Sequence, residues 1–379
     1  MLLTQDQKMI RDAVRAFAQE ELWPHAAQWD RDHTFPRQAH KGLAKTFAAL
    51  GCYGICVPEE YGGAGLDYLT LSLVLEEIAA GDGGTSTAIS VTNCPYNAIL
   101  MKYGTQAQKQ QWLVPAARGD ILGAFCLTEP HAGSDASAVR TTATREGGEY
   151  ALNGVKQFIT SGQNGQAAIV IAVTDKNAGK KGLSAFIVPT SNPGWKVAGL
   201  ERKLGQHSSD TAQILLQDCR IPGQNRIGEE GEGYKIALSA LEGGRIGIAS
   251  QSVGMARSAL EFAIRYAKER EAFGVPIFEH QAVAFRLADC ATRLEAARQL
   301  IWHAAALRDA GQPCLKEAAM AKLFASEAAE HVCSTAIQTL GGYGVTADFP
   351  VERIYRDVRV CQIYEGTSDV QKIIISRAL

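Results

Sequence analysis

The segment RVCQIYEGTSDVQKIIISRAL, which ends the chain, contains a carboxylate in an unusual position. Glu365 lies between a tyrosine and a glycine, after an apolar stretch. Ser368 and Gln371 have the spacing of a capping box, which predicts a helix that begins there and runs through residues 373–375 to the C-terminus. Glu365 therefore lies on the turn before this helix, where a carboxylate contributes little to packing. We interpret it as a candidate for chemistry.

Two strand-like segments end in hydroxyl side chains. AFCLTEPHAGSDAS (124–137) reaches Thr128 and then a turn of small polar residues, and GVKQFITSG (154–162) places Thr160 after an aromatic residue and an isoleucine. Each segment alone is compatible with an ordinary strand that ends in a polar turn. Taken together, Thr128 and Thr160 indicate a paired site, in which hydroxyl and backbone N–H donors line the edge of a cofactor.

Two basic segments are candidates for binding an anion. EGGRIGIASQSVG (242–254) predicts that Arg245 lies in the first turn of a long apolar helix, where it opposes the helix dipole. Arginine is well suited to phosphate, but a surface salt bridge is the alternative. EREAFGVPIFEHQAVAF (269–285) predicts a loop that begins near Arg270 and ends near Gln281. It is longer than most connections between bundled helices, which favours a binding role.

Two glycine-rich segments lack the context of a phosphate-binding motif. GEEGEGYK (228–235) has no lysine directly after its last glycine, and LGGYG (340–344) follows no strand. Neither is therefore a P-loop or a Rossmann turn. A glycine pair at the end of a long helix can nevertheless let the backbone approach a pyrophosphate.

The first part of the chain, to about Gly119, has a helical pattern. A capping box of Thr4 and Gln7 predicts a helix that continues to Pro24, and further helices are predicted over 42–51 and 69–81. From Ile121 onward, short apolar runs are separated by turn residues, which predicts an antiparallel sheet or small barrel. These runs are residues 121–127, 150–160, 167–173, 183–190 and 211–221.

Longer helices return after about Gly231. One, within residues 280–311, carries an apolar stripe, and a second is predicted from Leu315 to about Leu340. The predicted fold class is α+β, with an N-terminal helical domain (1–119), a middle antiparallel β domain (120–228) and a C-terminal four-helix bundle (229–379). The predicted stripe consists of Leu287, Cys290, Ala291, Leu294, Ala297 and Ile301.

Composition excludes several functions. Of the 379 residues, 46% are hydrophobic and 21% are charged, and the net charge of −2 gives no basic surface for nucleic acid or an anionic membrane. The nine cysteines follow no framework spacing, which favours free thiols in a reducing compartment, and the eight histidines form no metal-binding motif. The N-terminus has no secretory pattern, so we expect a cytoplasmic protein or the mature form of a mitochondrial matrix protein.

Seven segments, in order, resemble the acyl-CoA dehydrogenase family: PEEYGGAGLD, FCLTEPHAGSDAS, FITSG, EGGRIGIASQSVG, REAFGVPI, QTLGGYG and IYEGTSD. The resemblance implies a homotetramer with one FAD per subunit. It also implies α,β-desaturation of an acyl-CoA thioester to a trans-2-enoyl-CoA, with electrons passed to an electron-transfer flavoprotein. The details of GGRIGIASQSVG and YEGT favour a short-chain or short branched acyl group.

The resemblance also assigns roles to individual residues. Thr160 would hydrogen-bond the N5 region of the flavin, whereas Arg270, Gln281 and residues 338–342 would bind FAD partly across a subunit interface. The acyl-CoA would contact Ser134, Glu242, Arg245 and Gly366. The complete set of cofactor-binding residues would be Phe125, Cys126, Leu127, Thr128, Ser134, Phe158, Ile159, Thr160, Arg270, Gln281, Gln338, Thr339, Leu340, Gly341, Gly342, Thr367, Ser368 and Asp369.

Glu365 stands where many family members have their catalytic base. Some members instead carry the base on the residue before the arginine that corresponds to Arg245, but here that residue is Gly244, which cannot accept a proton. His131 departs from the glycine that is more common in the family, and we expect no catalytic role for it. The alternatives are an acyl-CoA oxidase on the same scaffold and a helical binding protein without enzymatic activity.

Overall fold

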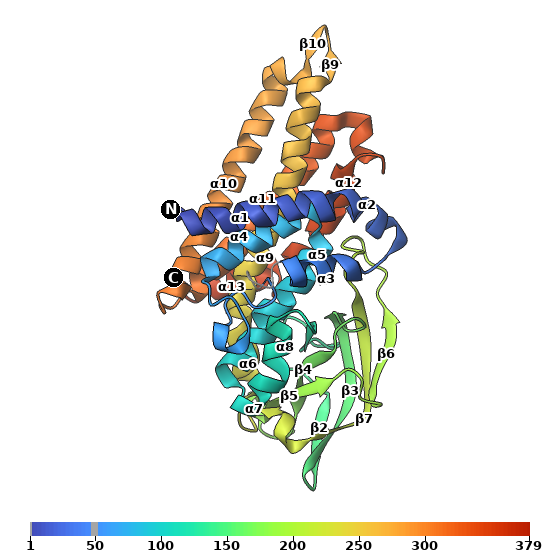
Figure 1. Ribbon diagram of the computed structural model, residues 1–379, viewed down its shortest axis with the longest axis vertical. Coiled ribbons are helices and arrows are strands. Elements are labelled where there is room, and N and C mark those ends of the chain that lie inside the picture. The colour runs from blue at the N-terminus through green and yellow to red at the C-terminus, as the bar shows by residue number, and fades with distance from the viewer. Residues whose placement is uncertain (1, 47–51) are drawn as a thin grey trace.

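The computed structural model describes residues 2–46 and 52–379, and it shows an elongated molecule with three regions (Figure 1). A sheet occupies one end and long helices extend to the other end; the first N-terminal helices lie along their junction, and the later ones lie beside the sheet. The helices of the N-terminal region are α1 (Gln5–Phe17), α2 (Trp23–Asp32), α3 (Arg37–Thr46), α4 (Tyr68–Gly81), α5 (Gly83–Val91), α6 (Ala98–Tyr103), α7 (Gln106–Gln108) and α8 (Val114–Ala117), with π-helical turns η1 (Ala18–Leu22), η3 (Thr92–Asn97) and η4 (Lys109–Leu113) and a 3₁₀ turn η2 (Glu59–Tyr61).

The starts of the N-terminal helices largely agree with the prediction, but some of their ends do not. The capping box of Thr4 and Gln7 is confirmed. The prediction that this helix ends at Pro24 is wrong, because a π-helical turn leads into α2 with the proline in its first turn, where no backbone N–H is needed. The helix predicted over 42–51 begins earlier, at Arg37, and residues 47–51 lie outside the described residues. The helix over 69–81 is confirmed as α4.

The middle region is a mostly antiparallel sheet, as predicted. Its order is β6-β7-β3-β2-β4-β5-β8, with β1 paired to β4. Two pairings are parallel, β1 with β4 and β2 with β4, and three strands were not predicted because their sequences lack a clear apolar run. The strands are β1 (Gly123–Cys126), β2 (Thr142–Glu146), β3 (Glu149–Thr160), β4 (Ala167–Val173), β5 (Leu183–Pro189), β6 (Trp195–Leu200), β7 (Thr211–Pro222) and β8 (Arg226–Ile227), with 3₁₀ turns η5 (Gly179–Gly182) and η6 (Gly223–Asn225).

Three long helices and a shorter one form the C-terminal bundle. In α10, five residues of the predicted stripe are buried, whereas Ala291 is exposed. The fourth member of the bundle, α12, has only 9 residues. The elements are α9 (Gly233–Glu269), a hairpin of β9 (Glu271–Ala272) and β10 (Val275–Pro276), η7 (Ile277–Glu279), α10 (Gln281–Asp309), α11 (Leu315–Leu340), η8 (Gly341–Val345), α12 (Pro350–Val358), η9 (Arg359–Gln362) and α13 (Ser368–Ser376).

The sequence placed Arg245 in the first turn of a helix, and this is wrong. Helix α9 begins twelve positions earlier, at Gly233, so the glycines before Arg245 lie inside the helix. Glycine is unfavourable in a helix interior, but it lets another element come close. A Cβ at Gly243 would lie 2.8 Å from the Tyr68 hydroxyl, and one at Gly254 would strike the backbone of Glu76. These glycines therefore mark the seam between α9 and α4.

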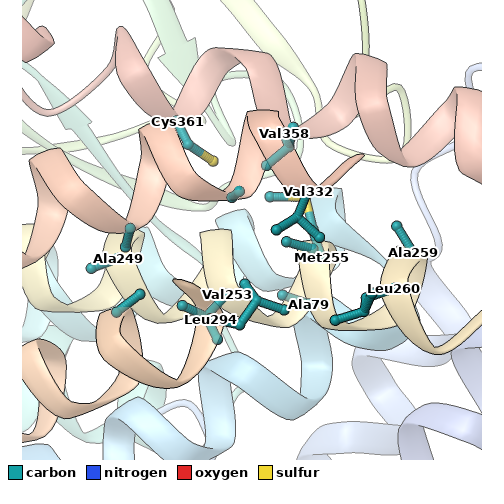
Figure 2. Packing of buried hydrophobic residues seen from close by; sticks show 14 of the residues in the cluster. Ala79, Ala249, Val253, Met255, Ala259, Leu260, Leu294, Val332, Val358 and Cys361 are labelled. Carbon is teal, nitrogen blue, oxygen red and sulfur yellow. The ribbon is translucent and has the colours of Figure 1, made fainter. Parts of the chain in front are cut away.

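The helical core joins helix α4 of the N-terminal region to the helices of the C-terminal region. Ala79 of α4, Val253 of α9, Leu294 of α10 and Val332 of α11 meet in one buried cluster (Figure 2). Many members of the cluster are alanines, which allow the helices to approach one another closely. This core fixes α9 against α11 and the C-terminal segment, and the candidate site lies at that junction.

Candidate active site

The turn that carries Glu365 lies between η9 and α13 and has an unfavourable backbone. Glu365 has a φ of 51°, in the left-handed region that residues with a side chain rarely occupy. Such strain persists only where surrounding contacts enforce it, and it is common at functional sites. The Glu365 N–H has no acceptor among the described residues, so it is free to donate to a ligand.

The cap of the last helix differs from the prediction. The N-cap of α13 is Thr367, whose hydroxyl accepts a hydrogen bond from Val370 N at 3.3 Å. Ser368 Oγ is buried without a partner, so the predicted capping box is wrong. Gln371 instead points back to the turn, and its Nε2 donates to the carbonyls of Gly366 (2.8 Å) and Glu365 (3.3 Å). Gln371 therefore holds the strained turn in place.

The Glu365 carboxylate lies directly against α9. A Cβ added to Gly244 would collide with Glu365 Oε2, so the glycine provides the space that the carboxylate fills. Oε2 is buried and has no hydrogen-bond partner in the part of the chain that the structure describes. Burial raises the pKa of Glu365 to about 7, although the positive charges of Arg245 and Lys322 act in the opposite direction. A carboxylate with this pKa is a far better proton acceptor than an exposed glutamate.

Two buried cations flank the turn. Arg245 is 4% exposed, and its Nε donates to Gln371 Oε1 at 3.1 Å, while Nη1 is buried and finds no partner within residues 2–46 and 52–379. Lys322 of α11 is fully buried, and its Nζ donates to the Gly366 carbonyl at 2.7 Å. Glu242, the neighbouring residue in the predicted substrate segment, pairs with Arg308 at 2.8 Å instead. Sequence reasoning named Arg245 but missed Lys322 and Gln371 as members of the site.

The ends of β1 and β3 lie side by side, as the two hydroxyl-rich segments suggested. Gln157 N donates to the Thr128 carbonyl at 2.9 Å. Beneath this contact, the fully buried Lys156 donates to the carbonyl of Leu127 (3.2 Å) and to Glu129 Oε1 (2.8 Å). The Glu129–Lys156 pair was missed, although a lysine within an apolar strand and a glutamate at a strand end are visible in the sequence.

A bulge near the end of β3 turns Phe158 outward. The register between β3 and β7 shifts between Lys156 and Ile159, and Phe158 has a φ of 57°. As a result its side chain is 61% exposed, whereas that of the next residue, Ile159, is buried. An exposed aromatic on strained backbone, next to Thr160, is a platform for a flat ligand. Cys126 and Leu127 also have buried side chains, so they face such a ligand through their backbone.

Comparison with known proteins identifies the family. Models of the N-terminal, middle and C-terminal domains of acyl-CoA dehydrogenases match residues 4–120, 124–219 and 231–379. The chain belongs to the acyl-CoA dehydrogenase family. It is 47% identical over 374 residues to the mitochondrial short-chain specific acyl-CoA dehydrogenase of Rattus norvegicus. The aligned residues cover 99% of this chain and 90% of the relative.

Solved structures of this fold match along the whole chain. Butyryl-CoA dehydrogenase from Megasphaera elsdenii superposes with a TM-score of 0.97 at 40% identity, covering 100% of this chain and 99% of the other. A chain from a structure described as the electron transferring flavoprotein of Acidaminococcus fermentans gives a TM-score of 0.97 at 46% identity, covering 100% and 98%. The predicted fold class is therefore confirmed, and the chain is an FAD-dependent oxidoreductase of the acyl-CoA dehydrogenase class.

The strand ends fit the isoalloxazine ring of FAD. Phe158 is exposed and Thr128 and Thr160 are half-buried at these strand ends, and Gly133, on the turn before the exposed Ser134, has no described atom within 4 Å of an added Cβ. Thr367 caps α13, and Ser368 and Asp369 begin it, next to the turn that carries Glu365 and on a different element from these strands. The described residues contain no cluster of side chains suited to a metal ion, and none of their helices is long and apolar enough to cross a membrane.

The other predicted cofactor residues lie at the opposite end of the molecule. Arg270 ends α9 and Gln281 begins α10, next to the β9–β10 hairpin and far from the sheet (Figure 1). The rings of Tyr266 and Tyr343 lie 6.4 Å apart, which places η8 near the end of α9. Gln338, Gly341 and Gly342 are exposed there, whereas Thr339 and Leu340 are buried. One chain therefore does not bring both groups of predicted FAD residues together.

Proposed function

We propose that this acyl-CoA dehydrogenase desaturates a short-chain acyl-CoA and that Glu365 is its catalytic base. The observation that supports this role is the Glu365 carboxylate, which is buried against Gly244 with Oε2 unpartnered, on a strained turn between two cations. Among the described residues, no hydrogen bond to Oε2 accounts for the burial of this carboxylate. Proton abstraction from the α-carbon of a thioester does explain it.

The residues at and around the turn have separate roles in proton abstraction. The FAD that the strand ends would hold would supply the acceptor for the hydride that leaves the β-carbon. Glu365 accepts the α-proton, and burial supplies the basicity that an exposed glutamate lacks. The free Glu365 N–H donates to the thioester carbonyl, where negative charge develops as the proton leaves. Gln371 and Lys322 hold the two carbonyls of the turn, so that carboxylate and N–H keep their relative positions.

FAD would be held by two groups of residues. Phe125, Thr128, Phe158 and Thr160 lie at the strand ends of one subunit and would contact the ring, where Thr160 would hydrogen-bond the N5 region. Arg270, Gln281 and residues 338–342 lie too far along the helices of the same chain to join them (Figure 1). We propose that they bind the FAD of a neighbouring subunit, which requires an oligomer, and the homotetramer expected from the family satisfies that requirement.

The names of the relatives and the packing near Glu365 support a short acyl chain in the substrate. The named relatives are short-chain specific and butyryl-CoA dehydrogenases. Near Glu365, an added Cβ at Gly247 would lie 2.8 Å from Ser90 Oγ and 3.3 Å from Cys94 Sγ, so α9 presses closely on α5 and η3. Such packing leaves little room for a long acyl chain. Ser134, Glu242, Arg245 and Gly366 stay as proposed substrate residues, although the buried Arg245 would act through Gln371.

Further features of the proposal concern partner, location and domain limits. The electron acceptor would be an electron-transfer flavoprotein. All nine cysteines are free, which supports a reducing compartment, the cytoplasm or the mitochondrial matrix. The domain limits remain those predicted, 1–119, 120–228 and 229–379.

A panel of acyl-CoAs from C4 to C16, including isobutyryl-CoA and 2-methylbutyryl-CoA, tests the substrate class with a dye acceptor. We expect the highest kcat/KM at C4 or on a short branched chain. Highest kcat/KM at C8 or longer would contradict the short-chain proposal. Rapid aerobic turnover without any acceptor would instead indicate an oxidase.

A further inference from the structure

Lys322 is an unusual residue for the interior of a helix bundle. Its side chain is fully buried in α11, and among the described residues its ammonium group has a backbone carbonyl, that of Gly366, as its hydrogen-bond partner and no ion-paired carboxylate. Lysine is almost never fully buried unless it is paired, because desolvating an ammonium group is costly. The structure gives Lys322 one hydrogen bond, to the Gly366 carbonyl at 2.7 Å. Packing alone therefore does not explain its presence.

We propose that Lys322 is a positioning residue for the base: its ammonium group holds the carbonyl after Glu365 and places a positive charge beside the carboxylate. This inference rests on the proposed role of Glu365. It assigns to Lys322 two separable contributions, one geometric and one electrostatic. The geometric contribution fixes the strained turn, and the electrostatic one favours the ionised form of the buried carboxylate.

The geometric contribution follows from the hydrogen bonds of the turn. The left-handed backbone at Glu365 is unfavourable, so the turn relaxes unless its carbonyls are held. Two buried donors hold the Gly366 carbonyl from different helices: Lys322 Nζ at 2.7 Å and Gln371 Nε2 at 2.8 Å. If one donor is lost, the other hydrogen bond to the Gly366 carbonyl remains. The turn should therefore persist, but its position should become less well defined.

The electrostatic contribution depends on every charged or titratable group near the base. Glu365 is influenced by Arg245 from α9 and Lys322 from α11, and it in turn affects Cys94 of η3. Around these groups lie Cys361 and Glu327, near Lys322, and Glu242, near Arg245. Burial raises the pKa of Glu365 and both cations lower it. Removing the charge of Lys322 should therefore raise this pKa further.

Three substitutions separate the two contributions. Lys322→Met removes both the donor and the charge at similar volume, Lys322→Gln keeps an N–H donor without the charge, and Lys322→Arg keeps the charge. Lys372→Met is the matched control, because this lysine lies on the exposed side of α13, next to Gln371, with a side chain that is 59% exposed. FAD content and oligomeric state of each variant show that the protein has folded.

Anaerobic flavin reduction by butyryl-CoA is measured from pH 5.5 to 9. In the wild type, the rate rises as Glu365 ionises. For Lys322→Met and Lys322→Gln, we expect this rise to shift upward by about one pH unit, the lower end of the shift that one close charge produces. We also expect Lys322→Met to have a lower plateau rate than Lys322→Gln. Lys322→Arg and Lys372→Met should keep the wild-type midpoint.

Infrared difference spectroscopy supplies a readout that does not depend on turnover. The carboxylic acid band of Glu365, identified by its absence in Glu365→Gln, should persist to higher pH in Lys322→Met than in the wild type. If Lys322→Met leaves both the band and the pH profile of the rate unchanged, the inference for Lys322 is wrong. The role of Glu365 would still stand in that case, provided that Glu365→Gln is inactive. If Glu365→Gln instead reduces flavin at the wild-type rate, the proposed base itself is wrong.

Discussion

Gly244→Ala is a small substitution that should damage catalysis without damaging the fold. An alanine in a helix interior is usually more stable than a glycine there, by about 0.5–1 kcal/mol. At this position, however, the new methyl group would occupy the space of the Glu365 carboxylate. The conflict falls on the end of a flexible side chain rather than on backbone, so the helix is preserved and the carboxylate moves.

The size of the movement follows from the geometry. The added Cβ would lie 2.8 Å from Glu365 Cδ, whereas ordinary contact begins at 3.4 Å, so the carboxyl carbon must retreat by about 0.6 Å, and the oxygen facing Gly244 by more. A misplacement of about 1 Å can cost about 100-fold in rate. Overpacking costs about 1–3 kcal/mol, and the gain in helix propensity offsets part of it.

Anaerobic stopped-flow reduction of the flavin by butyryl-CoA measures this effect. We expect flavin reduction about 100-fold slower than in the wild type, with FAD content unchanged and thermal unfolding within a few degrees. The control is Gly199→Ala in β6, where an added Cβ meets nothing within 4 Å. Near-normal reduction by Gly244→Ala would refute the placement of the carboxylate against α9.

Three further predictions concern ionisation and binding. Because the pKa of Glu365 is raised to about 7, the carboxylate is protonated and inactive below that pH, so flavin reduction should fall about tenfold per pH unit below 7; a rate that is flat down to pH 5 would contradict this. Arg270→Ala should weaken FAD retention and the tetramer together, as measured by flavin absorbance and gel filtration, and full occupancy in an unchanged tetramer would remove Arg270 from the site. Arg245→Ala should lower kcat more than it raises KM, with FAD content near normal, because Arg245 contacts Gln371 behind the turn; loss of flavin with unaltered kinetics per flavin would reverse this assignment.

Glu365 and the paired strand ends were accessible from the sequence because their signals are local. A lone acid on a turn and hydroxyls at two strand ends need no knowledge of packing to be noticed. The strain at Glu365 and the bulge at Phe158 were not accessible, since each depends on contacts with other elements. The wrong helix start before Arg245 has a similar cause: glycines that normally interrupt helices here allow close packing inside one.

Lys322 and Gln371 were missed for different reasons. Gln371 fits a capping box so well that its contact with the turn was overlooked, although Thr367 caps the helix instead. Lys322 looks like an ordinary surface lysine of an alanine-rich helix. Ala318 and Ala325, four residues before and three residues after Lys322, lie on the same face of the helix and are both buried. This helical spacing is visible in the sequence and could have identified Lys322 as a buried lysine.

Glu365→Gln tests the central claim most directly. The substitution keeps the size of the side chain and removes the proton acceptor, so Gln371, Lys322 and the last helix keep their contacts. FAD should stay bound and butyryl-CoA should still bind, because neither depends on the charge of residue 365. Anaerobic bleaching of the flavin by butyryl-CoA should slow by about 10²–10⁴-fold, as expected when a general base is removed. Bleaching at nearly the wild-type rate would show that Glu365 is not the base.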